Sequence, residues 1–184
     1  MKLIKLTVLP FLISSLIMVM VSCEPEAEQK KTTDFEKKGI PMTGAQVVPT
    51  SPSSALGTLD VSYTKETRIL TYKITWSGLV DSVAAVRIHG LAPIGYPAVT
   101  SALFPNGIAQ YIVGPSTPVT PIYPQKTSGK FTYAKSGSLS GTLLADGVVI
   151  KEHDILNGMF YISIYSNAAP YSTIGEIRGQ IKFQ

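Results

Sequence analysis

Hydrophobic and polar side chains alternate along much of the chain from residue 40 onward. In segments 59–64 and 70–77 every second residue is hydrophobic, and residues 65–68 between them suit a hairpin loop. Alternation of this kind is typical of antiparallel strands that place one face on a hydrophobic core. Similar alternation, or a short apolar run between turn residues, predicts further strands at 83–91, 97–104, 131–133, 139–144, 160–165 and 176–183.

Two segments depart from this alternation. Residues 148–156 have a helical pattern that Asn157 and Gly158 would end, and residues 105–127 contain five prolines. We expect 105–127 to be a long surface loop with room for a short strand at 108–113. The whole pattern predicts an all-β fold, either an antiparallel β-sandwich or a barrel-like Greek key, with at most one short helix.

The first 23 residues have the pattern of a bacterial lipoprotein signal. Residues 1–5 contain two lysines, residues 6–21 are mostly apolar, and Ser22 directly precedes Cys23. The apolar run of 16 residues is shorter than the roughly 20 that a membrane-spanning helix needs. We therefore expect residues 1–22 to be a signal peptide and Cys23 to be the lipid-bearing first residue of the mature chain.

The segment that follows differs from the remainder of the chain in composition. Residues 24–39 are polar, charged and aperiodic, so we expect residues 23–39 to be the lipidated cysteine and a flexible tether. Residues 40–184 are then expected to form one β domain. The expected location is the cell envelope, on the periplasmic or the surface side of a bacterial membrane to which Cys23 anchors the chain.

Charge and cysteine content exclude several classes of protein. Lys2 and Lys5 lie in the predicted signal, which leaves 14 of the 16 basic residues against 12 acidic ones. This near balance does not favour a nucleic-acid partner. The chain has one cysteine, which rules out a disulfide framework and a cysteine-based zinc site.

The candidate site is a polar face shared by three predicted strands. Arg87 and His89 are two residues apart, so they share one face of a strand, and the same spacing relates Glu176 to Arg178. If these strands are neighbours, they place one cluster of side chains together: Arg87, His89, Tyr165, Glu176 and Arg178. The alternative interpretation is a buried polar network that holds the strands in register.

Catalysis has little support among these residues. No phosphate-binding loop, dinucleotide fingerprint, HExxH or G-x-S-x-G motif is present, and the second histidine, His153, lies in a charged run typical of a surface. Acid–base or metal-dependent chemistry would rely on His89 with Glu176. A zinc site needs three or four ligands, and no nucleophile adjoins His89 or Glu176 in the sequence. We expect no catalytic residues, no metal and no cofactor.

Five motifs in order resemble those of the CHRD (chordin-type) domain family. Residues 43–49 resemble its opening motif, 55–57 its small-residue step, 70–79 one of its strands, 88–92 its Ile-His-Gly motif, and 175–181 its closing Gly-Glu-Ile-Arg-Gly-Gln motif. The resemblance covers about residues 40–184. It implies a β-rich extracellular domain; the family includes chordin, which binds growth factors, and has no established enzymatic activity.

The chain departs from the family pattern at two positions. Arg87 stands where the family usually has the first histidine of His-x-His, and Tyr165 stands where it usually has a third histidine. If those histidines bind a metal in relatives, only His89 of the set is present here.

The leading hypothesis is a lipid-anchored, non-enzymatic binding or structural module outside the cytoplasm, with a protein or glycan partner. One alternative is the enzyme that would use His89 and Glu176. The other is a carbohydrate-binding protein that would use tyrosines of the proline-rich loops, namely Tyr96, Tyr111, Tyr123 and Tyr171.

Overall fold

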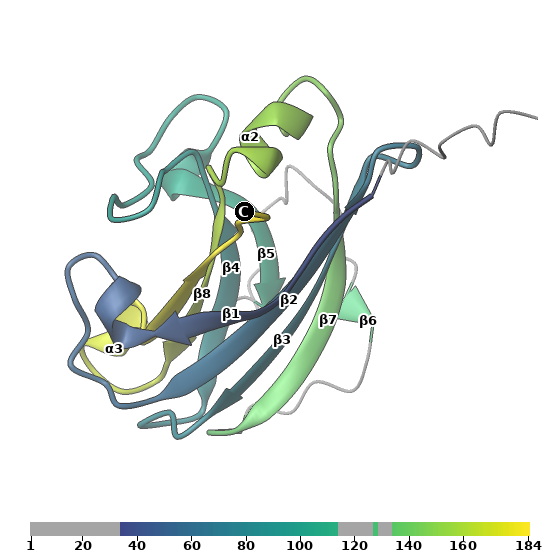
Figure 1. Cartoon of the computed structure of the whole chain (residues 1–184). Helices are drawn as coiled ribbons and strands as arrows, with labels where there is room; N and C mark the ends of the chain where they lie inside the picture. The colour runs from purple at the N-terminus through teal and green to yellow at the C-terminus, as the bar shows by residue number, and fades with distance from the viewer. Residues whose placement is uncertain (1–33, 114–126, 129–133) are drawn as a thin grey trace, which may run out of the picture. The chain divides into compact units, whose positions relative to one another are not determined.

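The computed structural model describes residues 34–113, 127–128 and 134–184, and in that part of the chain nine strands form one antiparallel sheet. The strands are β1 (Asp34–Thr43), β2 (Leu56–Thr64), β3 (Ile69–Ser77), β4 (Val83–His89), β5 (Ile108–Val113), β6 (Thr127–Ser128), β7 (Gly137–Leu144), β8 (Tyr161–Ser166) and β9 (Ile177–Gln180). Their order in the sheet is β5-β4-β8-β9-β1-β2-β3-β7-β6. The sheet curls into a barrel-like form (Figure 1), which confirms the predicted fold class.

Helices are few and short in the described residues. The helix α2 (Glu152–Leu156) lies inside the segment predicted to be helical, and α3 (Tyr171–Ile174) is a second helix where at most one was expected. A helix of four residues is barely one turn, so it cannot show a helical period in the sequence. Two 3₁₀ turns, η2 (Gly44–Gln46) and η3 (Pro105–Gly107), complete the set. None of the helices described is long and apolar enough to cross a membrane.

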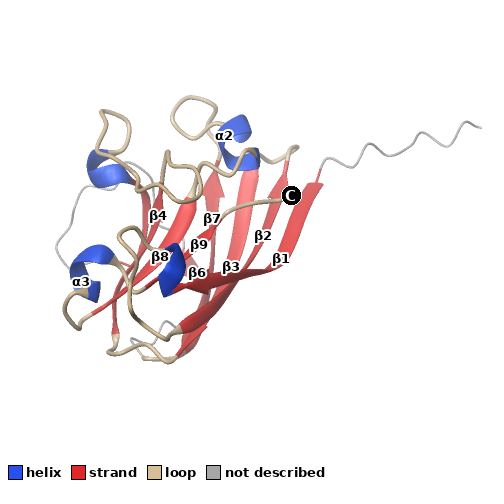
Figure 2. Ribbon diagram, turned by 60° about the vertical axis from the view of Figure 1, so that its left-hand side comes forward, coloured by secondary structure: helices blue, strands red, loops and turns tan. Residues whose placement is uncertain are grey.

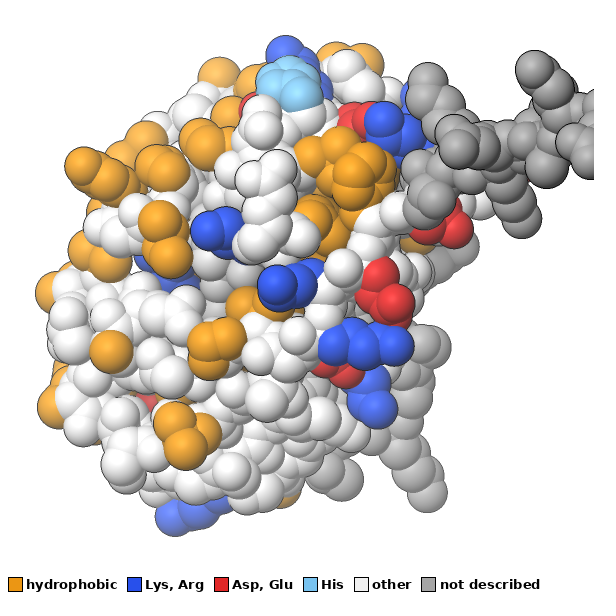
Figure 3. Space-filling view, in the orientation of Figure 1, with side chains coloured by type: hydrophobic (Ala, Val, Ile, Leu, Met, Phe, Trp, Pro, Cys, Tyr) orange, Lys and Arg blue, Asp and Glu red, His pale blue; other side chains and the backbone are white. Residues whose placement is uncertain are grey.

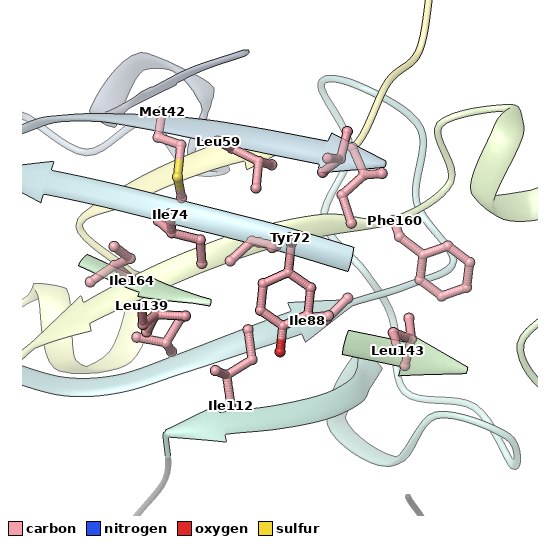
Figure 4. Packing of buried hydrophobic residues seen from close by; sticks show 14 of the residues in the cluster. Met42, Leu59, Tyr72, Ile74, Ile88, Ile112, Leu139, Leu143, Phe160 and Ile164 are labelled. Carbon is pink, nitrogen blue, oxygen red and sulfur yellow. The ribbon is translucent and has the colours of Figure 1, made fainter. Parts of the chain in front are cut away.

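The hydrophobic core fills the inside of the curled sheet. The alternating residues of β2 and β3 behave as predicted, because Leu59, Tyr63 and Ile74 are fully buried. Figure 4 shows labelled side chains from several strands, among them Ile88 of β4 and Ile164 of β8, packed within the same cluster. Burial of these apolar faces is the main stabilising contribution to the fold.

A buried polar contact joins β5, at one end of the sheet, to strands near the other end. The side chain of Gln110 on β5 donates from Nε2 to the carbonyl oxygen of Thr142 on β7 at 3.1 Å, and its Oε1 accepts from the hydroxyl of Tyr72 on β3 at 3.2 Å. Figure 4 shows Tyr72 pointing from β3 toward Ile112 of β5. These bonds therefore help to close the barrel where backbone pairing is absent between β5 and β7.

Replacement of Gln110 by alanine is expected to lower the free energy of unfolding by about 1 to 3 kcal/mol, because it leaves two buried polar groups without a partner. The variant Tyr72→Phe removes one bond of the pair and should cost about 1 kcal/mol. Urea unfolding of the two variants beside the unmodified chain measures both values. Equal stability of all three proteins would contradict a role for Gln110 in closing the sheet.

The first strand begins earlier than the predicted domain boundary at residue 40. β1 starts at Asp34, inside the segment expected to be a tether, and residues 34–37 pair with the end of β2. A register shift follows between Lys37 and Ile40, where the backbone N–H of Gly39 (φ 67°) donates to Asp60 Oδ1 at 2.8 Å. The side chains before the shift are largely exposed, so this half of the strand has no hydrophobic alternation to reveal it.

Two other strand predictions have different outcomes. The strand expected at 97–104 is wrong: these residues form a loop in which Val99 and Leu103 are exposed, so their apolar character does not reflect a buried strand face. The short strand at 108–113 is confirmed as β5. The strand predicted at 131–133 lies outside the described residues, as does the signal and lipidation segment that ends at Cys23.

Candidate functional site

The polar face of β4, β8 and β9 lies on the outside of the barrel-like sheet. On β4, Val86 and Ile88 point into the core, so Arg87 and His89 point outward. On β8, Ile162 and Ile164 point inward and the three alternating residues point outward. Figure 2 shows loops in front of β8 and β9, and the contacts described below assign this cover to the loop of residues 90–107.

Strand register brings the outward side chains together in rows. Arg87 lies opposite Ser163, and Ser163 lies opposite Arg178; in the next row His89 lies opposite Tyr161, which lies opposite Gln180. We call these six residues and Tyr165 the outer-face cluster. Four of the five residues predicted for the site belong to it: Arg87, His89, Tyr165 and Arg178.

His89 is held on three sides. Its Nδ1 lies 3.0 Å from the carbonyl oxygen of Gly107, and its Nε2 lies 2.9 Å from the hydroxyl of Tyr165. A carbonyl can only accept, so Nδ1 carries the proton and Nε2 accepts from Tyr165. The imidazole also stacks on the ring of Tyr161, with centroids 5.0 Å apart.

Burial sets the charge of this histidine. Desolvation is the largest cause that lowers the pKa of His89, and together with the positive charges of Arg87 and Arg178 it brings that pKa to about 4 against the opposing contact with Gly107. Burial also raises the pKa of Tyr165, although Arg87 opposes that shift. At neutral pH the imidazole and the phenol are therefore both uncharged, and neither imidazole nitrogen is free to take a proton from a substrate.

The two arginines of the cluster are stacked on aromatic rings and have no carboxylate partner among the described residues. The guanidinium of Arg178 lies 3.5 Å from the ring centroid of Tyr161, and that of Arg87 lies 4.4 Å from the ring centroid of Tyr165. Nε of Arg87 is buried without a hydrogen-bond partner.

Arg178 fastens the covering loop to the sheet. It donates from Nη1 to the carbonyl oxygen of Tyr96 at 2.8 Å, and from Nη2 to the carbonyl oxygen of Pro93 at 3.4 Å and to Gln180 Oε1 at 2.7 Å. All three acceptors are uncharged. Gln180 in turn donates to the carbonyl oxygen of Ala92 at 3.0 Å. The cluster thus has two positive charges and only neutral partners in the part of the chain that is described.

Glu176, the fifth predicted residue, lies apart from the cluster. Its Oε1 accepts from Ser53 Oγ at 2.7 Å and from the backbone N–H of Val80 at 2.8 Å, and its Oε2 accepts from Ser166 Oγ. The residue precedes β9, so the strand alternation that would align it with Arg178 does not extend to it. Its contacts join three chain segments, which is the structural role that the alternative interpretation proposed.

An open pocket of about 430 Å³ lies beside Arg178. Its lining comprises residues 45–50, together with Ile94, Gly95 and Arg178. Sequence reasoning did not predict residues 45–50, 94 and 95 as site residues. The available signal was their position: most of 45–50 belongs to the opening motif, Arg178 belongs to the closing motif, and 94–95 follow the Ile-His-Gly motif.

The residues present do not suit a metal ion. Arg87, His89 and Tyr165, which occupy the three positions where the family pattern has histidine, lie in contact with one another. A guanidinium cannot act as a ligand, and the phenol of Tyr165 remains protonated. Across the described ranges no three His, Cys, Asp or Glu side chains gather as a metal site would require.

The tyrosines proposed for carbohydrate binding do not gather on one exposed surface. Tyr96 is exposed on the loop over the cluster, Tyr171 is buried in α3, and Tyr111 on β5 is partly buried and near Arg87. Tyr123 lies outside the described residues. An aromatic platform of the kind expected is therefore not formed by the three tyrosines that the structure places.

Comparison with known proteins identifies one family. The family model for the CHRD domain matches residues 39–181. No curated protein and no solved structure matches the chain. The match begins at Gly39, in β1, and ends just after β9, so it covers the barrel-like sheet except the first half of β1, together with the pocket and the outer-face cluster.

Proposed function

This chain belongs to the CHRD domain family, and from that membership we propose that it is a lipid-anchored binding module of a bacterial cell envelope rather than an enzyme. The observation that carries the proposal is the pocket beside Arg178. Its walls come from three segments that are far apart in the sequence, and they leave an open volume of about 430 Å³. Pockets of this size are typical of small-ligand sites.

The arrangement of titratable groups supports a binding role over a catalytic one. Both imidazole nitrogens of His89 are engaged, and both carboxylate oxygens of Glu176 accept hydrogen bonds from other residues. A general acid or base must reach the proton of a substrate within hydrogen-bond distance. Neither side chain is free to do so, because His89 and Glu176 are almost fully buried and bind different partners.

The exposed surface near the pocket suits a partner with apolar groups. Loop 90–107 carries five large hydrophobic side chains that are exposed: Leu91, Ile94, Tyr96, Val99 and Leu103. Figure 3 shows hydrophobic side chains at the surface on the side of the molecule where this loop lies in Figure 1. A protein or glycan of the cell envelope that contacts this loop would also reach the pocket.

The anchor rests on the sequence of residues 1–23. A lipidated Cys23 would be followed by ten residues before β1 begins at Asp34. Fully extended, this stretch would span at most about 40 Å, so the domain would stay close to the membrane that holds the lipid. Two or more acyl chains would make the attachment stable.

Lipidation is expected to depend on Cys23. In bacteria that express the full chain and are grown with radiolabelled palmitate, the unmodified protein should take up label and sediment with membranes. The variant Cys23→Ser should take up none, because the thiol that carries the lipid is missing. Ser15→Ala, a change within the predicted signal, is the matched control and should keep the label. An unmodified protein without label would contradict the anchor.

The binding role has a separate test. The mature chain in detergent micelles is titrated by calorimetry with envelope glycans, with peptides and with small organic acids. We expect at least one class to bind and to shift the backbone NMR signals of residues 45–50. Failure of all three classes to bind would overturn the assignment as a binding module.

A further inference from the structure

We propose that the pocket beside Arg178 binds an organic carboxylate, with the carboxylate group held by the guanidinium of Arg178 and the apolar part of the ligand held by residues 45–49 and Ile94. The proposal rests on the binding role above and names the chemical class of the ligand.

The uncompensated charge of the outer-face cluster is the first argument. Arg178 is 2% exposed, and a charge that is removed from water is costly unless it is paired. Its three hydrogen bonds go to two carbonyl oxygens and one amide oxygen, and no carboxylate contacts it in the described ranges. An anionic ligand would supply the missing counter-charge.

The remaining donors of Arg178 are the second argument. A guanidinium has five N–H groups, and three hydrogen bonds account for at most three of them. The residue lines the pocket, so a ligand bound there lies beside this side chain. Hydrogen bonds between a guanidinium and an oxyanion are about twice as strong as bonds between neutral groups.

Arg87 adds to the positive potential of the site. It lies two strands away from Arg178, with Ser163 between them in the same row of the sheet. Strands are about 4.8 Å apart, which places the two backbone positions roughly 10 Å from each other. The Nε of Arg87 is buried and unpartnered, and no ion pair joins this guanidinium to a carboxylate of the described residues.

The walls of the pocket select an organic anion over an inorganic one. Five of the lining residues are apolar: Ala45, Val47, Val48, Pro49 and Ile94. Contact with these side chains favours a ligand that has a hydrocarbon body. Inorganic phosphate or acetate has the charge but little or none of that body, and a neutral glycan has neither feature.

The test uses matched pairs of acids and primary amides. The mature chain in detergent micelles is titrated with N-acetylleucine, phenylacetate and octanoate, and with the amide of each, while backbone NMR signals of residues 45–50, 94 and 95 are followed. We expect at least one acid to bind there, and its amide to bind at least tenfold more weakly. Acetate and inorganic phosphate should also bind at least tenfold more weakly. An acid and an amide of equal affinity, or no binding by any acid, would overturn the proposal.

A charge placed at the pocket mouth separates local from general electrostatic effects. Ile94→Glu puts a carboxylate beside the site at a residue that is 64% exposed, and it should weaken binding of the acid at least tenfold. Val148→Glu is the matched control, since Val148 is 71% exposed, lies outside loop 90–107 and does not line the pocket. It should leave the affinity within twofold of the unmodified protein. Equal weakening by both variants would contradict a carboxylate at Arg178.

Direct replacement of the arginine completes the test. Arg178→Gln removes the charge and should abolish preference for the acid over its amide. If this variant fails to fold, the comparison of Ile94→Glu with Val148→Glu decides the matter alone. A neutral glycan or peptide that shifts the same NMR signals would overturn the carboxylate proposal while the binding role stands. Failure of every probe would overturn both.

Discussion

Replacement of Glu176 by alanine is expected to lower the free energy of unfolding by about 3 to 5 kcal/mol. The carboxylate is fully buried and accepts hydrogen bonds from Ser53, Val80 and Ser166. These donors belong to the segment before β2, the turn between β3 and β4, and the end of β8. Loss of the Glu176 carboxylate would leave these three donors without a partner and would open a cavity between the segments.

Two further variants distinguish this role from a general effect of removing charge. Glu176→Gln keeps an acceptor for Ser53 and Val80, and its amide group can donate to the hydroxyl of Ser166, so a smaller loss of about 1 to 2 kcal/mol is expected. Glu66→Ala removes an exposed carboxylate from the turn between β2 and β3 and should change stability by less than about 0.5 kcal/mol. Urea unfolding monitored by tryptophan fluorescence gives all three values. A Glu176→Ala protein within 1 kcal/mol of the unmodified chain would contradict the structural role of Glu176.

Acidification is expected to destabilise the protein through His89. In the folded chain the pKa of His89 is about 4, below the ordinary value of about 6.5 that the unfolded chain adopts. Between these two values the unfolded state binds a proton that the folded state does not, so stability falls as the pH is lowered through this window. At pH 4 and below, the lowered pKa of His89 destabilises the folded chain by about 3 kcal/mol. Above pH 6.5 it has no effect on stability.

The variant His89→Gln isolates this contribution from that of the carboxylates. Glutamine has no titratable group, so its loss of stability between pH 7 and pH 4 should be about 3 kcal/mol smaller than that of the unmodified chain. Urea unfolding at pH 7, 6, 5 and 4 measures the two slopes. An NMR titration of the His89 ring protons should show its midpoint near pH 4. Identical slopes in the two proteins between pH 6 and pH 4 would refute a neutral, buried His89.

Strand prediction succeeded where one face of a strand meets the core. In β2, β3 and β8 the alternation of core-facing and outward-facing residues is a local property, because successive side chains of a strand point to opposite faces. It failed where burial does not follow that rule. The first half of β1 pairs through its backbone with exposed side chains, and the apolar residues Val99 and Leu103 of the loop lie at the surface.

The candidate site was predictable in part for the same reason. Arg87 and His89 had to share a face, and their side chains do contact Tyr165. The prediction that Glu176 and Arg178 lie in one cluster was wrong. Glu176 precedes the strand, and its side chain binds Ser53 and Ser166 instead. Residue spacing predicts a shared face only where the backbone is regular.

By itself, the sequence determined the all-β class, most strand positions, the CHRD family and the polar face, because each follows from local alternation or from short motifs. Tertiary structure alone decided that loop 90–107 buries that face, that Glu176 lies elsewhere, and that the opening and closing motifs meet at one pocket. These features depend on contacts such as that between Ser53 and Glu176, 123 residues apart. The order of strands in the sheet creates such contacts, and local pattern does not encode that order.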